Sequence, residues 1–248
     1  MPEVFATISW FYALQLHLGV NTVVAVQRAT EPTTPERAAA VSRRWRAYKS
    51  GKQKPSAQTV NLAEKLTSWP RAILHSPLWD ALRLDRSPDT VARKLLGTTS
   101  KEGDDLLKWM LDRHESHSDP RWIRKRCRAM VARGNLEGLA ILTVCVKLAG
   151  KRDASSLALT FYRHATDCLV ILGSWLYAHG IAQALAEYYE KILLPAYCQD
   201  HQFGVFSSDH YLRAVYRLDR AILAIQKKDS RKLTTEEVIT AMVKILDI

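Results

Sequence analysis

The sequence predicts an all-α protein. Apolar residues recur at helical spacing along most of the chain, whereas alternating runs of β-branched residues are almost absent. Glycine is scarce, at 10 of 248 residues. With 47% hydrophobic and 25% charged residues, the composition is that of a globular protein. It excludes a wholly disordered chain and a collagen-like fibre, and the length suffices for one large domain or two small ones.

The N-terminal part is expected to hold three helices. One is predicted over Ser9–Gln27 and a second over Pro35–Lys49, with Pro35 in the first turn, where its missing N–H costs nothing. A third is predicted to begin at Pro55-Ser56, because a serine hydroxyl caps free N–H groups of a first turn. It is expected to end at Ser68-Trp69-Pro70, since the residue before proline avoids the helical conformation.

The remaining chain is expected to form further helices after a linker. Arg83–Gly103 contains the turn-forming residues of a linker, so we place a domain boundary near residue 95. Thr234 and Glu237 have the spacing of a capping box and predict the start of the last helix. His201–Ser208 either shapes a pocket or joins two helices. The other predicted helices are Asp104–His117, Pro120–Arg133, Leu136–Leu148, Ser155–His164, Asp167–Leu194 and Asp209–Gln226.

The cysteines and the apolar segments indicate a cytoplasmic protein. Cys127, Cys145, Cys168 and Cys198 include no pair at the close spacing of a zinc or redox motif, so reduced, buried thiols are expected. The segment Met1–Val26 lacks the basic region of a signal peptide. No stretch reaches the roughly 20 apolar residues of a transmembrane helix. We therefore expect no membrane association.

Charge is the unusual feature of the composition. The chain carries 36 Lys+Arg against 25 Asp+Glu, a net charge of +11, and its pI is near 9.6. Residues 37–72 hold nine of these basic residues and one acid, Glu64. Such a patch on a soluble protein favours polyanion binding. The nine are Arg37, Arg43, Arg44, Arg46, Lys49, Lys52, Lys54, Lys65 and Arg71.

Two aromatic residues within this run predict how the basic helix is oriented. Trp45 and Tyr48 are three residues apart, so they share one helical face and are expected to pack inward. Arg43, Arg44 and Arg46 then project outward toward groove and backbone. Lys49, Lys52 and Lys54 are expected to neutralise phosphates.

A second basic cluster lies near residue 125. Arg121, Arg124, Lys125 and Arg128 share one helical face and are predicted as further nucleic-acid contacts. Arg126 and Arg133 lie off that face. The alternative interpretation is an ordinary solvated helix face.

The run Ala39–Leu66 resembles the second half of a phage-repressor-type helix-turn-helix domain. In that family a recognition helix with two spaced apolar anchors precedes a glycine, a basic residue, Pro-Ser and an amphipathic helix. Trp45 and Tyr48 match the anchors, and Gly51 matches the glycine that stops the helix. The core face of the next helix is matched by Val60, Leu62, Ala63 and Leu66.

The resemblance implies a DNA-binding module within residues 1–95, followed by a helical bundle over residues 96–248 for oligomerisation, sensing or partner binding. It places Ser42, Arg43 and Arg46 at base edges, and Lys52 and Lys54 at phosphates. Lys49 stands where the family often has an acid, and Thr30–Pro35 is rich in proline for a compact turn. A modified helix-turn-helix, or a basic module that binds backbone without reading bases, is therefore also open.

No catalytic motif is recognised, so neither an enzyme nor a cofactor or metal is predicted. His114 and His117 are spaced for a shared metal with Asp112 or Asp119, but the stretch is polar, so we expect a solvated helix end. Ser207, Ser208 and Asp209-His210 have triad residue types without the turn that exposes a nucleophile.

The predicted function is a bacterial-type DNA-binding regulator, with DNA favoured over RNA as its partner. The C-terminal helices are candidates for homodimer or protein-complex contacts. The alternative is a small helical interaction subunit of a larger nucleoprotein or phage-defence assembly. That alternative predicts exposed apolar patches on the C-terminal helices, first of all in the tyrosine-rich segment Leu176–Tyr197.

Overall fold

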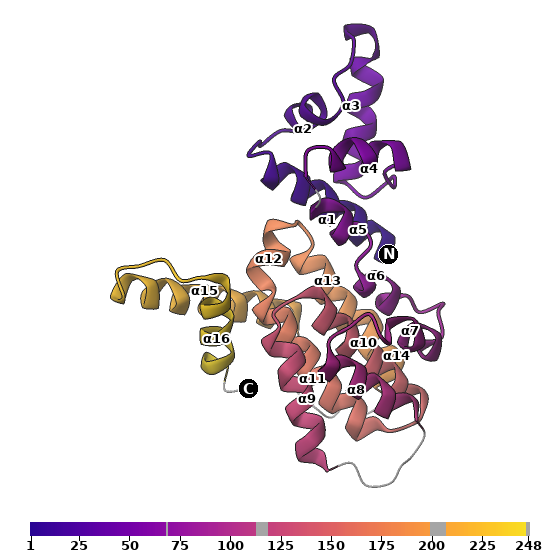
Figure 1. Cartoon of the computed structure of the whole chain (residues 1–248), viewed down its shortest axis with the longest axis vertical. Helices are drawn as coiled ribbons and strands as arrows, with labels where there is room; N and C mark the ends of the chain where they lie inside the picture. The colour runs from indigo at the N-terminus through magenta and orange to yellow at the C-terminus, as the bar shows by residue number, and fades with distance from the viewer. Residues whose placement is uncertain (68, 113–118, 199–206, 247–248) are drawn as a thin grey trace. The chain divides into compact units, whose positions relative to one another are not determined.

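The structure is a computed structural model that describes residues 1–67, 69–112, 119–198 and 207–246. Every regular element in these residues is helical, which confirms the predicted all-α class (Figure 1). The chain forms two compact units. Unit 1 comprises Met1–Trp79 and Trp175–Ala182, and unit 2 comprises Asp80–Ser174 and Gln183–Ile248. The division thus lies after Trp79 rather than near residue 95.

Unit 1 contains two helices where the sequence predicted one over Ser9–Gln27. The first helix ends at His17, and Thr22 starts the next by accepting a hydrogen bond from the Ala25 amide at 3.1 Å. The Thr22 cap marks the start of a second helix. The spacing of hydrophobic residues continues across this break, so it predicted one helix instead of two. The helices that begin in its N-terminal stretch are α1 (Pro2–His17), α2 (Val23–Thr30), α3 (Pro35–Lys49), α4 (Ala57–Glu64), α5 (Trp69–Leu74) and α6 (Pro77–Leu82).

The core of unit 1 is built on aromatic rings from α1 and α3. Trp10 stacks on Trp45 with ring centroids 5.9 Å apart, and Tyr48 meets both rings edge-on at 5.8 and 5.5 Å. Phe11 contacts Trp45 from the next position of α1, at 6.4 Å. All four residues are fully buried, as predicted for Trp45 and Tyr48. Burial on this scale fixes which side of α3 faces the core.

The turn after α3 follows the predicted pattern. Gly51 has φ +69°, the left-handed conformation expected of a helix stop, and a Cβ there would lie 2.6 Å from the Val4 side chain. Ser56 caps α4 by accepting from the Thr59 amide at 3.2 Å. Val60 and Ala63 are buried.

The end of this region departs from the prediction. Leu66 is 41% exposed and Leu62 is only half-buried, because α4 ends at Glu64 and its buried face stops with Ala63. Trp69-Pro70 does not follow α4 directly but starts α5.

Residues 175–182 complete unit 1 from a distant part of the chain. Gly180 lies against the Tyr12 ring of α1 so closely that a Cβ would come within 2.6 Å of it. His179 is buried and stacks on Trp175 with ring centroids 3.7 Å apart. The first unit therefore depends on two separate stretches of sequence.

Unit 2 is organised around α10, which is buried from Gly138 to Ala149 and packs against α7, α8, α9, α11 and α14. Its apolar residues surround the whole helix, as expected of a central core helix. The elements within unit 2 are α7 (Pro88–Leu95), α8 (Lys101–Leu111), α9 (Pro120–Ala132), α10 (Leu136–Lys151), α11 (Ser155–Ile171), the π-helical turn η1 (Tyr189–Leu193), α14 (Leu194–Tyr197), α15 (Ser208–Lys228) and α16 (Thr235–Ile245). Two further helices, α12 (Gly173–Ala178) and α13 (Ala182–Tyr188), have residues in both units.

Several predicted boundaries in unit 2 are wrong. The expected linker Arg83–Gly103 contains α7, which buries Val91, Ala92 and Leu95. Ser155–Ile171 is one continuous helix, and the single helix predicted over Asp167–Leu194 is divided among α11, α12, α13 and η1. The π turn precedes Pro195, which has no N–H to continue a regular α-helical ladder.

Other starts in unit 2 are confirmed. The helices predicted from Pro120 and Leu136 begin at these residues, and α15 begins at Ser208. The capping box is present: Thr234 and Glu237 each accept a hydrogen bond from the other's backbone N–H. The loop predicted over His201–Ser208 lies mostly outside the described residues. Among the described helices, none has the length and apolarity needed to cross a membrane.

Unit 2 buries one lysine completely. The Lys147 ammonium donates hydrogen bonds to the carbonyl oxygens of Ala81, at 3.1 Å, and Arg83, at 2.5 Å. It also lies 5.7 Å from the centre of the Tyr197 ring. Tyr188 donates a hydrogen bond to the Leu82 carbonyl at 2.6 Å. These bonds satisfy carbonyl groups at the end of α6 that have no helical partner.

We expect Lys147 to make the stability of the protein rise at alkaline pH. Burial lowers its pKa from 10.5 to about 8, so between these values the unfolded chain binds more protons than the folded one. The free energy of unfolding should therefore increase with pH in this window, on the order of 2 kcal/mol. Urea unfolding of the natural protein and Lys147→Met at pH 8 and pH 10.5 measures it.

The difference between the two proteins isolates the lysine, because all other titrating groups are common to both. A stability difference that stays constant over this pH window would contradict the role given to Lys147.

We also expect the cysteines to be unreactive in the folded protein. All four are buried and reduced. Burial raises the pKa of Cys127 to about 12 and that of Cys198 to about 11, and it raises the pKa of Cys145 and Cys168 as well. Because the thiolate is the reacting form, dithionitrobenzoate should titrate no thiol without denaturant and four after unfolding. A thiol that reacts rapidly in the folded protein would disprove this assignment.

Candidate nucleic-acid interface

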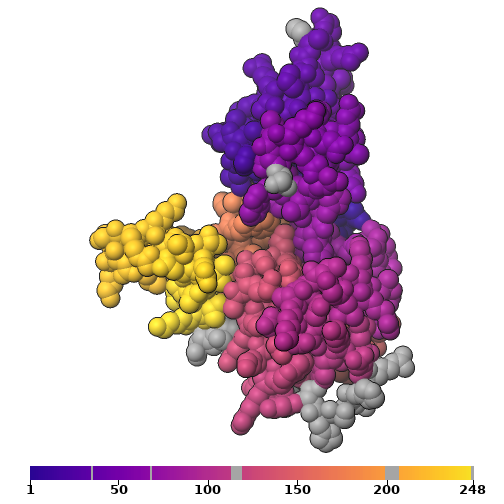
Figure 2. All heavy atoms as spheres, viewed as in Figure 1, coloured from indigo at the N-terminus to yellow at the C-terminus, as the bar shows by residue number. Residues whose placement is uncertain are grey.

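The basic surface of unit 1 is carried by α3. Val41, Trp45 and Tyr48 hold one side of the helix in the core, while Arg43 and Arg46 are exposed on the other. Neither arginine has an ion-pair partner among the residues that the structure describes. Atoms of α3 lie at the surface in the space-filling view (Figure 2). Two guanidinium groups are thus displayed to solvent by a helix whose rotation is fixed.

The third arginine of this group, Arg44, is used inside the fold. Its guanidinium pairs with the Glu31 carboxylate at 2.5 Å, and the Trp45 indole donates to the same carboxylate at 3.3 Å. The pairing with Glu31 raises the pKa of Arg44. Glu31 follows α2 directly, so this contact ties the start of the connector to the middle of α3. The ion pair gives Arg44 a structural role.

The other predicted contacts around α3 differ in exposure. Lys52 and Lys54, in the loop after Gly51, are exposed and have no ion-pair partner within the described part of the chain. Lys49 is half-buried, with its ammonium 5.7 Å from the centre of the Tyr12 ring. Ser42 is half-buried.

Small side chains accompany the exposed arginines. Ala39 and Ala40 are exposed one helical turn before Arg43, and Ser50 is exposed one turn after Arg46. The only acid in α3 is Glu36, which is exposed in the first turn. The outward face of α3 is therefore cationic over its C-terminal half and sterically open beside Arg43.

The remaining basic residues between Arg37 and Arg71 are likewise either paired with a carboxylate or exposed without an ion-pair partner in the described part of the chain. Arg71 is paired with Glu64 at 2.7 Å. Arg37 and Lys65 are exposed, and neither has an ion-pair partner among the described residues. Of the nine cations between Arg37 and Arg71, two are therefore neutralised by carboxylates in the part of the chain that the structure describes.

The connector between α2 and α3 is short. Only Glu31 to Thr34 separate the two helices, which pack against each other. The prolines that were expected to prevent a compact turn fit it, because Pro32 lies in the connector and Pro35 begins α3. The two packed helices are thus joined by a compact connector of four residues.

On α9, Arg121, Arg124, Lys125 and Arg128 are all exposed. The two cations predicted to lie off this face are paired instead. Arg126 contacts Asp105 at 2.8 Å and also lies over the Trp122 ring, and Arg133 contacts Glu137 at 3.4 Å.

Sequence reasoning missed two features of the charge distribution. Glu31 was not recognised as the partner of Arg44, because no local pattern links residues 13 apart. It also overlooked α15, where Arg213, Arg217 and Arg220 are exposed. Their spacing of four and three residues places them on one helical face, so this basic surface could have been predicted from the sequence.

The residues considered for catalysis take structural positions where the structure describes them. His114 and His117 lie outside the described residues. Asp119 caps α9 by accepting from the Arg121 amide at 2.9 Å, and Ser207 caps α15 by accepting from Asp209. Within the described residues, no three His, Cys, Asp or Glu side chains are grouped to hold a metal ion.

Comparison with known proteins adds no relative: no protein-family model, no curated protein and no solved structure matches this chain.

We expect Glu31→Gln to destabilise unit 1 by about 1 kcal/mol, because it removes the charge that pairs with the partly buried Arg44. Thermal unfolding followed by circular dichroism measures the change. Glu36→Gln is the control, because it removes the same charge from an exposed position of the same unit, where the carboxylate bonds to Thr34 rather than to Arg44. An equal effect of the two substitutions would show that the Glu31–Arg44 pair does not hold α3.

Proposed function

We propose that this protein is a DNA-binding protein of the bacterial regulator type, which contacts duplex DNA through the outward face of α3 and the loop that follows it. One observation carries the proposal: Arg43 and Arg46 are exposed opposite the buried Trp45 and Tyr48, and they have no carboxylate partner among the described residues. A rigid helix with this distribution presents positive charge to phosphates.

The shape and chemistry of α3 favour a duplex as the target. An α-helix fits the major groove of B-form DNA, where arginine binds the O6 and N7 atoms of guanine through two hydrogen bonds. The small side chains of Ala39 and Ala40 allow close approach on the face that carries Arg43. Lys52 and Lys54 then lie at the end of the helix as phosphate contacts.

The short connection between α2 and α3 supports the same function. In helix-turn-helix proteins the second helix of such a pair enters the major groove while the first crosses the backbone. By this correspondence α3 is the recognition helix. Unit 2 then supplies dimerisation, ligand sensing or partner contact, and its exposed α9 cations Arg121, Arg124, Lys125 and Arg128 add a second surface for anions.

Replacing both exposed arginines of α3 tests the proposal. The double variant Arg43→Gln and Arg46→Gln should bind a mixed-sequence duplex about 100-fold more weakly, since each of the two charged hydrogen bonds is worth on the order of 1.5 kcal/mol or more. The slope of log K against log salt should become shallower by about 2, because two fewer phosphates are neutralised. Fluorescence anisotropy at several salt concentrations measures both quantities.

The matched control is the double variant Lys108→Gln and Arg217→Gln, which removes the same charge from exposed positions of unit 2. Equal weakening by the two double variants would show that only net charge matters and would overturn the assignment to α3.

The alternative function, an interaction subunit of a larger nucleoprotein or phage-defence assembly, is supported by a different observation. Tyr216 and Leu223 on α15 are 63% and 59% exposed, and they lie seven residues apart on one helical face. In Leu176–Tyr197, by contrast, Tyr188 and Tyr189 belong to the core, while Tyr177 is exposed. Absence of duplex binding by the natural protein, together with elution as a larger species on size exclusion, would favour this alternative.

A further inference from the structure

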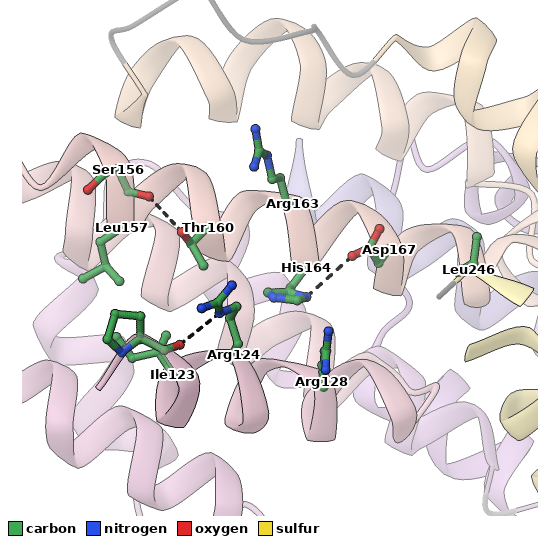
Figure 3. A pocket seen from close by; sticks show the side chains of 11 residues that line it. Ile123, Arg124, Arg128, Ser156, Leu157, Thr160, Arg163, His164, Asp167 and Leu246 are labelled. Carbon is green, nitrogen blue, oxygen red and sulfur yellow. Dashed lines mark hydrogen bonds and ion pairs between the residues drawn. The ribbon is translucent and has the colours of Figure 1, made fainter. Parts of the chain in front are cut away.

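Unit 2 contains a groove that shares no residue with α3, the helix to which duplex binding is assigned, although it includes two of the α9 cations. It lies between α9 and α11, has a volume of about 680 Å³, and is bordered at one end by Leu246, just after α16 (Figure 3). This volume falls in the range of small-molecule sites. All of its lining residues belong to unit 2.

Three arginines line the groove, Arg124 and Arg128 from α9 and Arg163 from α11. Arg124 and Arg128 extend from α9 toward the side of α11 that carries Thr160 and His164 (Figure 3). Arg124 donates to the Pro120 carbonyl of its own helix at 3.3 Å. Arg128 has no ion pair with any residue that the structure describes. Two guanidinium groups therefore face the groove without being neutralised there.

The opposite wall offers further polar groups. His164 places its Nδ1 atom 3.6 Å from the Asp167 carboxylate, and this buried atom makes no hydrogen bond to a described residue. Asp167 is the one carboxylate among the lining residues. Ser156 and Thr160 contribute hydroxyl groups. The Thr160 hydroxyl donates its hydrogen to the Ser156 carbonyl at 2.9 Å, so the Thr160 oxygen can still accept a hydrogen bond.

The end of the groove near the helix starts is partly apolar. Pro120 begins α9, and Ser156 lies in the first turn of α11, so both helices point their N-terminal ends to this side. The positive end of the α11 dipole adds to the arginine charge, whereas that of α9 is met by the capping carboxylate of Asp119. Half-buried Leu157 and the small exposed part of the otherwise buried Ile123 supply the apolar surface there. A bare anion would leave this surface uncovered.

We propose that the α9–α11 groove binds a small organic phosphate, with the phosphate held by Arg124 and Arg128 and an apolar or planar body lying against Ile123 and Leu157. Arginine suits this role because its planar guanidinium binds phosphate oxygens through paired hydrogen bonds. The site lies outside the surface assigned to duplex binding on α3 and does not depend on that assignment.

The test uses the full chain and three probes: adenosine monophosphate, inorganic phosphate and adenosine. Isothermal titration calorimetry should show one bound adenosine monophosphate, weaker binding of phosphate and no binding of adenosine. Arg128→Gln should weaken adenosine monophosphate at least about 10-fold. Leu157→Ser should weaken it while leaving phosphate unchanged. Arg217→Gln, an exposed arginine of α15 outside the groove, is the control and should bind normally.

Three results would overturn the proposal. The first is absence of binding by both adenosine monophosphate and phosphate. The second is equal weakening by Arg128→Gln and the control. The third is Arg128-dependent binding of a single-stranded oligonucleotide without binding of the mononucleotide, which would assign the groove to nucleic acid. Circular dichroism of each variant confirms that it is folded.

The two proposals fail separately. The double variant Arg43→Gln and Arg46→Gln should retain binding of adenosine monophosphate, and Arg128→Gln should retain the α3-dependent part of duplex binding. Loss of adenosine monophosphate binding in the α3 variant would contradict an independent groove.

Discussion

The packing of α3 on α1 through Trp10, Phe11, Trp45 and Tyr48 is the contact on which the first unit depends. Each ring is large and fully buried, and truncation of such a side chain typically costs about 3–5 kcal/mol. Because indole and phenol rings interlock in few arrangements, this packing fixes the rotation of α3 as well as its position. The direction in which Arg43 and Arg46 point is therefore set by the residues on the opposite side of the same helix.

The placement of carboxylates separates cations that belong to the fold from cations that face solvent. Arg44, Arg71, Arg126 and Arg133 each have an acidic partner, and each partner comes from another helix or connector. Arg43, Arg46, Lys52 and Lys54 have none among the described residues. Surface cations that have no carboxylate partner repel one another in the folded state. A bound polyanion reduces this repulsion, which favours its binding. A net charge of +11 is thus less informative than the identity of the unpaired groups.

The sequence predicted those parts of the structure that depend on local chemistry. The spacing of Trp45 and Tyr48, the glycine at position 51, the Ser56 cap and the Thr234–Glu237 capping box involve residues at most a few positions apart. The Glu31–Arg44 pair was not predictable in this way, because it forms only when the connector folds back on α3. The α9–α11 groove was also missed, since its two walls are separated in sequence by the whole of α10. Apolar spacing likewise continued across the breaks that divide residues 167–194.

The return of residues 175–182 to the first unit has a consequence for how this protein can be divided. A fragment that ends at Trp79 would lack the segment that covers Tyr12, and that ring would be left facing water. Recombination that exchanged the N-terminal region alone would transfer an incomplete core. A folded first unit therefore requires residues from both stretches, even though most of it is encoded in a single uninterrupted one.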